Sequence, residues 1–200
     1  MTNVNLSELY APPSEMIVKA VLDHLLPFHL SYLKAATFFC LASGSADGLD
    51  ASPRGGAPGF VHALDNKTVA FADWPGNNRI ASLTNLQQDD RIGMLFIFPG
   101  LEVFMRINGH AAISLNPDLL LALAEGERVP KTAIVVRIDE VLFHCGKAVN
   151  RAKLWQPESM LDRKDVPSPG EIKAAMTGED SSAARAMDEG YYTAIRGQLY

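Results

Sequence analysis

The 200-residue sequence is poor in the features of secreted and membrane-spanning proteins. Its two cysteines, Cys40 and Cys145, are too few for a disulfide scaffold, so both are expected to be reduced thiols. No apolar run approaches the roughly 20 residues that a membrane helix needs. The first residues lack the basic start and apolar run of a secretory signal. The sequence therefore predicts a cytoplasmic protein with no membrane partner.

Basic residues are also scarce, which limits the partners that the chain can bind. Its 18 Lys and Arg and 23 Asp and Glu give a formal net charge of −5. Such a chain offers no broad basic field to polynucleotide phosphates, so nucleic acid is not expected as a partner. A small, local anion site is still compatible with this net charge.

Motifs for hydrolysis, nucleotide binding and metal binding are missing as well. The sequence has no Ser-His-Asp order, GxGxxG stretch or P-loop, so hydrolase and nucleoside-triphosphate functions lack a motif. His144 and Cys145 are neighbours, but adjacent residues on a strand point to opposite faces. No metal site is therefore predicted.

What the sequence does contain is a series of short segments rich in strand-forming residues and bounded by turn residues. These segments are 37–42, 49–53, 60–64, 68–72, 91–98, 103–113 and 132–143. Their number and their turns predict an antiparallel barrel or sandwich, mainly β with flanking helices. The predicted helices lie between Ser14 and Pro27, at 28–36, at 76–88, after Asn116-Pro117, from Gly146 onward, at 171–176 and at 182–195.

This pattern divides the chain into three predicted parts. Residues 1–36 form an N-terminal helical segment, and residues 37–156 form the barrel domain. Residues 157–200 are more polar and broken by prolines. They are predicted to be a helical arm that packs on the barrel or on a partner subunit.

The most informative polar segment runs from Asp73 to Asn85 (DWPGNNRIASLTN), where a strand ends and a helix is predicted to begin. Free backbone N–H groups at a helix start favour an anion, and the helix dipole adds to that preference. Asn77 and Asn78 add amide donors, and Arg79 adds a charged fork suited to phosphate oxygens. Alternatively, an asparagine only caps the helix and Arg79 is a solvated surface charge.

A second polar segment covers residues 50–59 (DASPRGGAPG). Its glycines allow a backbone to approach a ligand closely. Ser52 and Arg54 project polar groups from the end of a strand. The alternative is a flexible hairpin loop without a ligand.

Basic residues elsewhere form two weaker candidates. Lys147 and Arg151 are four residues apart, so they share one face of the predicted helix, together with Trp155. Arg106 and Asn108 alternate with apolar neighbours and share one side of a strand. The alternatives are a solvated helix face in the first case and the wet face of the barrel in the second.

Five segments in this order give the chain a family resemblance. They are Ser52-Pro53-Arg54-Gly55, Pro58-Gly59-Phe60-Val61, Pro75-Gly76-Asn77-Asn78-Arg79, Arg106-Ile107-Asn108-Gly109 and Phe143-His144-Cys145-Gly146-Lys147-Ala148. Over roughly residues 30–156 the chain resembles a bacterial branch of the pyridoxamine 5′-phosphate oxidase-like FMN-binding split-barrel proteins. The ordered set is more specific than any single segment.

The resemblance implies a six-stranded antiparallel split barrel that works as a homodimer, with FMN in each of two clefts between subunits. Asn77, Asn78 and Arg79 take the place of the family's phosphate-holding cluster. Strand residues Ser52 and Arg54 would lie along the flavin, and Lys147 and Arg151 would approach it from the C-terminal side. The predicted cofactor-binding residues are Ser52, Pro53, Arg54, Asp73, Asn77, Asn78, Arg79, Arg106, Lys147 and Arg151.

The resemblance supports FMN as the cofactor but does not support pyridoxamine phosphate as the substrate. The chain lacks the Arg-x-Val-Leu-Leu strand and the C-terminal Arg-Leu-Ser-Pro stretch of authentic pyridoxamine-phosphate oxidases, so it is not expected to oxidise pyridoxamine phosphate. The leading hypothesis is an FMN-dependent oxidoreductase that acts on a small molecule, with reduced nicotinamide as a candidate electron donor. One alternative is a non-catalytic module that stores flavin, senses redox state or binds haem, for which His144 is a candidate ligand. Another is a barrel kept only for dimerisation.

Overall fold

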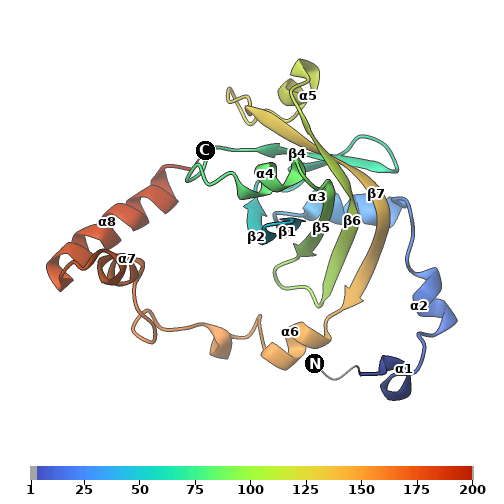
Figure 1. The fold of residues 1–200 in the computed structure, drawn as a ribbon, viewed down its shortest axis with the longest axis horizontal. Coiled ribbons are helices and arrows are strands. Elements are labelled where there is room, and N and C mark those ends of the chain that lie inside the picture. The colour runs from blue at the N-terminus through green and yellow to red at the C-terminus, as the bar shows by residue number, and fades with distance from the viewer. Residues whose placement is uncertain (1–3, 200) are drawn as a thin grey trace. The chain divides into compact units, whose positions relative to one another are not determined.

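An antiparallel sheet of seven strands organises the first of the two units into which the chain divides (Figure 1). The computed structural model describes residues 4–199, and its units are Met1–Ala148 and Val149–Tyr200. The strands are β1 (Phe38–Ser45), β2 (Gly48–Gly55), β3 (Val61–Ala63), β4 (Thr68–Asp73), β5 (Arg91–Ile97), β6 (Val103–Ser114) and β7 (Thr132–Cys145). Their order in the sheet is β2-β1-β5-β6-β7-β4-β3.

The sheet curls around its main hydrophobic core, which confirms the predicted fold class, an antiparallel split barrel with flanking helices. The sheet has seven strands instead of six because the short segment β3 pairs with the edge of β4. In most strands alternate residues point into the core, as Phe39 and Leu41 of β1 and Met94 and Phe96 of β5 do. The opposite side chains of the same strands form an outer face.

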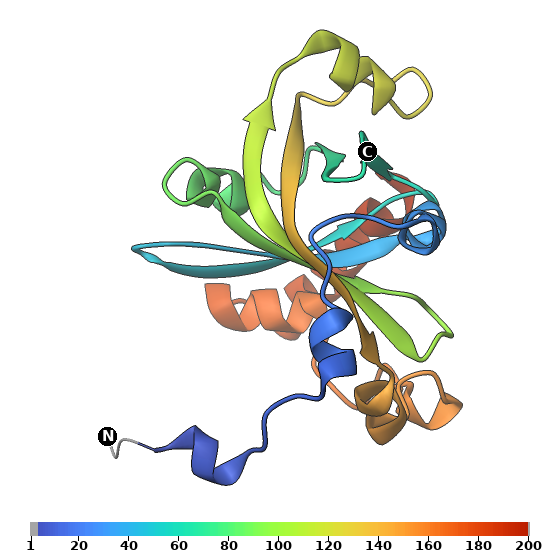
Figure 2. The same ribbon diagram turned by 90° about the vertical axis from the view of Figure 1, so that its right-hand side faces the viewer.

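Strands β6 and β7 run side by side along the barrel and are much the longest (Figure 2). Their register shifts at a bulge between Asn108 and Gly109. A Cβ atom on Gly109 would lie 2.0 Å from the carbonyl oxygen of Arg137, so only glycine fits this crossing. The bulge therefore fixes how the outer-face residues of β6 and β7 meet.

Short helices flank the barrel in the first unit. They are α1 (Leu6–Leu9), α2 (Glu15–Lys19), α3 (Pro27–Ala35), α4 (Ala81–Leu86) and α5 (Pro117–Ala122). The helix predicted between Ser14 and Pro27 is only five residues long. Its apolar residues Ile17 and Val18 are more than half exposed. Beyond the helix, the backbone of Leu22 exchanges hydrogen bonds of 3.0 and 2.7 Å with Val141, so the chain there is already extended.

The helix predicted at 76–88 is also shorter than expected, because α4 begins only at Ala81. Asn78 has a φ of 59°, a left-handed conformation that interrupts a helix. The side chain of Asn77 accepts a hydrogen bond from the backbone N–H of Arg79 at 3.0 Å. Such local bonds from asparagine compete with helix formation. Residues 74–80 therefore form a loop.

The second unit is helical. Helix α6 (Lys147–Ala152) begins where the first unit ends, and η1 (Pro157–Ser159), α7 (Pro169–Thr177) and α8 (Ser181–Gly197) follow. Lys153 has a φ of 51°, so the predicted helix ends before Trp155, which does not share a helix face with Lys147 and Arg151.

Helices α7 and α8 are each longer than predicted and pack against each other. Helix α7 begins with a capping box formed by Ser168 and Glu171. A Cβ atom on Gly170 would lie 2.1 Å from the carbonyl oxygen of Ala184, so the two helices touch through a glycine. None of the helices in residues 4–199 is long and apolar enough to cross a membrane.

Candidate functional site

A row of polar side chains on β2 meets the helix α4. Asp50, Ser52 and Arg54 alternate along the strand, so they share one side of it. The Oγ atoms of Ser52 and Ser82 both donate hydrogen bonds to Oδ2 of Asp50, at 2.9 and 2.7 Å. Nη2 of Arg54 donates to Oγ of Ser82 at 3.1 Å. These contacts connect four side chains into one network, which we call the β2–α4 cluster.

Arg54 is the only cation in this cluster, and no carboxylate neutralises it directly. Within residues 4–199, none of the ion pairs closer than 4.0 Å includes Arg54. Its Nη1 donates to the carbonyl oxygen of Pro53 at 2.9 Å. Its Nε is buried and has no hydrogen-bond partner. A buried N–H without a partner is costly, and an anion beside this guanidinium would satisfy both the N–H and the charge.

Asp73 ends β4 beside this cluster. Burial raises the pKa of the Asp73 carboxyl, and the nearby positive charge of Arg54 opposes that rise. Asp73 is therefore close enough to Arg54 for their charges to interact. Ser82 is within hydrogen-bond distance of Arg54 as well. These two residues flank the loop 74–80, so both ends of the loop are fixed close to Arg54.

The predicted phosphate residues lie on this loop. Asn77, Asn78 and Arg79 are all exposed, and none of them belongs to a helix. The turn made by Asn77 and the left-handed backbone of Asn78 set the course of the loop. The anion site was predicted at a helix start, but the structure has a loop with a basic side chain there.

Other predicted residues are not part of the cluster. Arg106 pairs in register with Leu95, which pairs with Cys40, whereas Ser52 pairs with Leu41. Because directly opposed residues share a face, Arg106 and Ser52 lie on opposite faces of the sheet.

On that outer face Arg106 is held by a carboxylate. Its Nη2 donates to Oε1 of Glu140 at 2.6 Å, and Nδ2 of Asn108 donates to the same oxygen at 2.7 Å. The pairing neutralises the charge of Arg106.

The remaining predicted residues are Pro53, Lys147 and Arg151. Pro53 pairs with Cys40 and so faces away from the cluster. Proline has no backbone N–H, but β2 is an edge strand with β1 as its single neighbour, so Pro53 costs no hydrogen bond to a strand on the other side. Lys147 and Arg151 are exposed on α6, one turn apart. Arg151 belongs to the second unit.

Two members of the cluster were missed by the sequence reasoning, Asp50 and Ser82. Asp50 was detectable, because it continues the alternation that contains Ser52 and Arg54. Ser82 depends on which face of α4 meets β2, and nothing in the local sequence gives that. Within residues 4–199 there is no group of three or more His, Cys, Asp or Glu side chains placed to hold a metal ion.

The chain resembles known proteins in sequence and in fold. Residues 25–145, more than half of the chain, match the family model described as pyridoxamine 5′-phosphate oxidase. No curated protein matches the sequence significantly.

Solved structures of similar fold come from several bacteria. HupZ of Group A Streptococcus is 20% identical, with a TM-score of 0.47 over 58% of this chain and 92% of its own. A candidate pyridoxamine 5′-phosphate oxidase of Lactobacillus delbrueckii is 18% identical, with a TM-score of 0.48 over 60% of this chain and 95% of its own. An FMN-binding protein of Syntrophomonas wolfei is 10% identical, with a TM-score of 0.44 over 57% of this chain and 80% of its own.

Proposed function

The chain belongs to the pyridoxamine 5′-phosphate oxidase family, and we propose that it is a flavoprotein that binds FMN and acts as an oxidoreductase on a small molecule. The family match covers the whole barrel, from residue 25 to residue 145. It includes β2, β4 and α4, which carry the β2–α4 cluster. The cofactor thus follows from the family, and the residues that hold it are argued from the cluster.

The observation that carries the proposal is the unneutralised guanidinium of Arg54. Within residues 4–199 its hydrogen bonds go to a hydroxyl and a backbone carbonyl and not to a carboxylate, and its buried Nε has no partner. An FMN phosphate would supply the missing acceptor and the opposite charge. Ser52 and Ser82 hold hydroxyl groups beside the guanidinium, and hydroxyls also bind phosphate oxygens. The residues present therefore fit the phosphoryl end of FMN.

The loop 74–80 provides the second half of the proposed phosphate site. Its two ends are fixed beside Arg54, so Asn77, Asn78 and Arg79 are assigned as further contacts to the cofactor. Two arginines from different elements, Arg54 and Arg79, would then balance the double charge of the phosphate. Lys147 and Arg151 are assigned to the same cofactor from the C-terminal side, on family grounds alone.

FMN, when bound, supplies the redox chemistry, so no side chain of the protein has to act as nucleophile or general base. The chain's own residues bind and orient the cofactor. A reduced nicotinamide is the proposed electron donor, and the substrate is a small molecule other than pyridoxamine phosphate.

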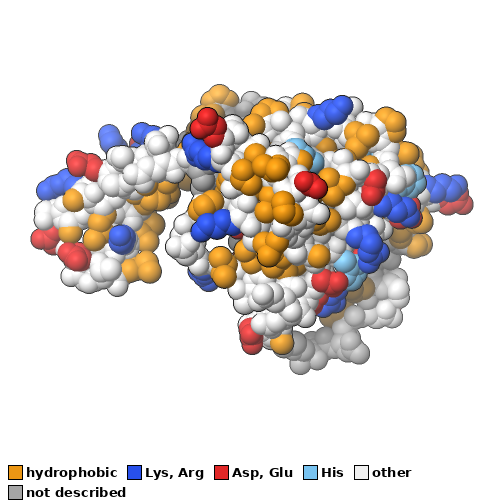
Figure 3. Space-filling model, turned by 90° about the horizontal axis from the view of Figure 1, so that it is seen from above, with side chains coloured by type: hydrophobic (Ala, Val, Ile, Leu, Met, Phe, Trp, Pro, Cys, Tyr) orange, Lys and Arg blue, Asp and Glu red, His pale blue; other side chains and the backbone are white. Residues whose placement is uncertain are grey.

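A homodimer with FMN at the subunit interface completes the proposal. Large apolar side chains stay exposed on the first unit, among them Leu49, Leu115 and Leu121. Figure 3 shows hydrophobic side chains gathered on one face of the molecule. Exposed apolar surface of this kind often marks an interface. Sedimentation equilibrium should give twice the chain mass of 21.7 kDa for the FMN-loaded protein, and an FMN-loaded monomer would contradict the interface.

Flavin binding is tested by titrating the flavin-free protein with FMN and with riboflavin, which lacks the phosphate, and following flavin fluorescence. Because the phosphate carries the recognition, FMN should bind at least about tenfold more tightly than riboflavin. Equal affinities for FMN and riboflavin would show that the β2–α4 cluster does not bind the phosphate. A Soret band after incubation with haem, together with no flavin binding, would favour the haem-binding alternative.

Catalysis is tested separately with the FMN-loaded protein. NADH or NADPH should bleach the flavin absorbance anaerobically, and oxygen or an added acceptor should restore it. Binding without any bleaching would leave a flavin store or sensor in place of an enzyme.

A further inference from the structure

A hollow of about 480 Å³ lies on the outer face of the barrel, where the first half of β5 meets β1 and β6. Its position differs from that of the β2–α4 cluster. Ala42 on the hollow's floor and Leu41, which pairs with Ser52, are neighbours on β1 and so point to opposite faces. The volume falls in the range of small-molecule sites.

Small residues on neighbouring strands create the floor of the hollow. Ala42 of β1, Gly93 of β5 and Asn108 of β6 stand side by side in register. A Cβ atom on Gly93 would lie 3.1 Å from Oδ1 of Asn108 and 3.8 Å from the Cβ of Ala42. The missing side chain of Gly93 therefore leaves the Asn108 carbonyl oxygen facing open space.

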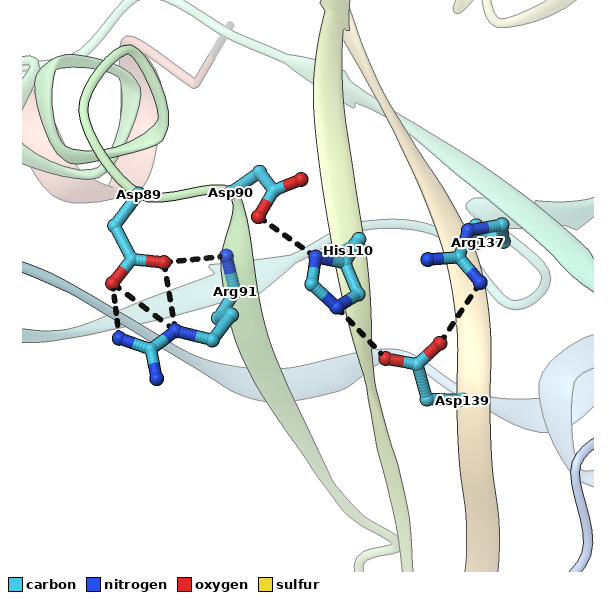
Figure 4. Close-up of polar contacts among 6 residues, drawn as sticks. All are labelled: Asp89, Asp90, Arg91, His110, Arg137 and Asp139. Atoms are coloured by element: carbon cyan, nitrogen blue, oxygen red, sulfur yellow. Dashed lines mark hydrogen bonds and ion pairs between the residues drawn. The ribbon is translucent and has the colours of Figure 1, made fainter.

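Arg91 forms one wall of the hollow, and one edge of its guanidinium group is already hydrogen-bonded. Asp89 receives hydrogen bonds from Nε and Nη2 of Arg91 (Figure 4). This pairing lowers the pKa of the Asp89 carboxyl to about 2. It engages one edge of the guanidinium fork, and the edge that carries Nη1 faces away from Asp89.

The opposite wall is a carboxylate. Oδ2 of Asp139 lies 3.1 Å from Nε2 of His110, and Oδ1 of Asp139 accepts a hydrogen bond from Nη1 of Arg137 at 3.1 Å (Figure 4). His110 is held on its other side by Asp90, with 2.7 Å between Nδ1 and Oδ1. An ionised carboxylate has about four lone-pair directions, so Asp139 can accept further hydrogen bonds from a ligand in the hollow.

We propose that this hollow binds a small zwitterion of the free amino-acid class. The carboxylate of the ligand lies at the open edge of Arg91. Its ammonium group lies between Asp139 and the side-chain oxygen of Asn108. The hollow presents both charges on separate walls, so a ligand with one charge would leave one wall unsatisfied. A doubly charged phosphate is disfavoured because Asp89 and Asp139 flank the space on both sides.

The experiment titrates the isotope-labelled 200-residue chain with each of the twenty common amino acids and follows the backbone amide signals by NMR. The best binder should saturate at millimolar concentration or below and shift the signals of Gly93 and His110. Its decarboxylated amine and its deaminated acid should each bind at least about tenfold more weakly, because each loses one charge-assisted contact. If either analogue binds as tightly as the amino acid, or no amino acid saturates below about 50 mM (a binding energy of under 2 kcal/mol), the proposal is overturned.

Variants assign the two walls. Arg91→Gln should reduce the affinity for the amino acid at least about tenfold and leave the affinity for the amine unchanged. Asp139→Asn should do the reverse, weakening the amine and sparing the acid. Ala42→Leu fills the floor without changing any charge and should abolish binding of all three ligands. Arg137→Gln, which changes a neighbour of Asp139 outside the hollow, is the matched control and should leave the tenfold preference for the zwitterion intact. A preference that survives in Ala42→Leu would place the ligand elsewhere.

Discussion

Arg54 and Arg106 are a matched pair within one sheet. Both are partly buried strand residues, and in both the Nε atom is buried without a partner. Their other contacts differ. Arg106 donates to the carboxylate of Glu140, whereas Arg54 donates to the hydroxyl of Ser82 and to a backbone carbonyl. Arg106 is therefore neutralised by a carboxylate of the protein itself, whereas the charge of Arg54 is not paired with a carboxylate in the described part of the chain.

Strand position alone therefore does not mark a binding arginine. Both residues alternate with less polar neighbours, and both were predicted as cofactor contacts. Their partners separate them, because the partly buried Arg106 is already neutralised by Glu140 and gains little from a phosphate. We therefore expect Arg54 to contact the ligand and Arg106 to stabilise the outer face.

The largest expected effect follows from Arg54→Ala. Losing a charge-assisted hydrogen bond to the phosphate should weaken FMN binding by about 1.5–3 kcal/mol, roughly 10- to 150-fold in Kd. Arg106→Ala is the matched control and should change the Kd by less than about threefold, since its charge is already paired. Fluorescence titration with FMN and with riboflavin measures both variants. Equal losses of FMN affinity in Arg106→Ala and Arg54→Ala would contradict the difference between the two arginines.

A smaller effect, with the opposite sign, is expected for Asp73→Asn. The ionised carboxylate of Asp73 lies near Arg54 and competes with the phosphate for its charge. Removing it should tighten FMN binding by on the order of threefold to tenfold.

The pH dependence of the Asp73→Asn effect distinguishes this electrostatic cause from a change in the local structure of the site. Burial raises the pKa of Asp73 in the folded protein. The native state therefore holds this proton more tightly than the unfolded chain, and the stabilisation is complete below the unfolded pKa. It is lost as pH rises through the folded pKa. The advantage of Asp73→Asn in stability should thus grow as pH rises from the unfolded to the folded pKa of Asp73, and its advantage in FMN affinity should grow as pH rises through the folded pKa. An advantage that is equal at all pH values contradicts the electrostatic explanation.

Glu140→Gln tests the other arginine through its partner. The change leaves Arg106 without its carboxylate on a surface where both side chains are about one-third exposed. Solvent screens part of the loss, so the free energy of unfolding should fall by about 1 kcal/mol. Urea unfolding measures this, with FMN affinity as the second readout. A large gain of FMN affinity without a loss of stability would assign Arg106 to the cofactor after all.

The sequence predicted the strands of this fold well, for a physical reason. Buried strands alternate core and outer residues and end at turn residues, and both signals are local. Ser52 and Arg54 were found in this way, as polar residues near a strand end. Asp50 belongs to the same alternation within the predicted strand 49–53, and it was missed because only Ser52 and Arg54 were considered as the polar groups of that segment.

The features that the sequence did not give depend on contacts between distant segments. Glu140 neutralises Arg106 from 34 residues away on β7, and Ser82 reaches Arg54 from 28 residues away on α4. The start of the helix after β4 was misplaced for a different reason. Asparagine favours both a helix cap and a left-handed turn, and Asn78 adopts the turn.

The smallest effect concerns Arg91, a third arginine, which is neutralised on the surface instead of in a partly buried position. Its hydrogen bonds lower the pKa of the Asp89 carboxyl from 3.8 to about 2. A lowered folded pKa stabilises the protein above the unfolded pKa, and that stabilisation is lost as pH falls through the folded value. Arg91→Gln should return the pKa of Asp89 towards 3.8, which an NMR titration of the carboxyl signal measures between pH 1.5 and about 5. The acid unfolding curve should shift only slightly, because the pair is exposed and screened by solvent. A pKa that stays near 2 would mean that backbone donors, not the guanidinium, hold the Asp89 charge, and Arg91 would then resemble Arg54 more closely than Arg106.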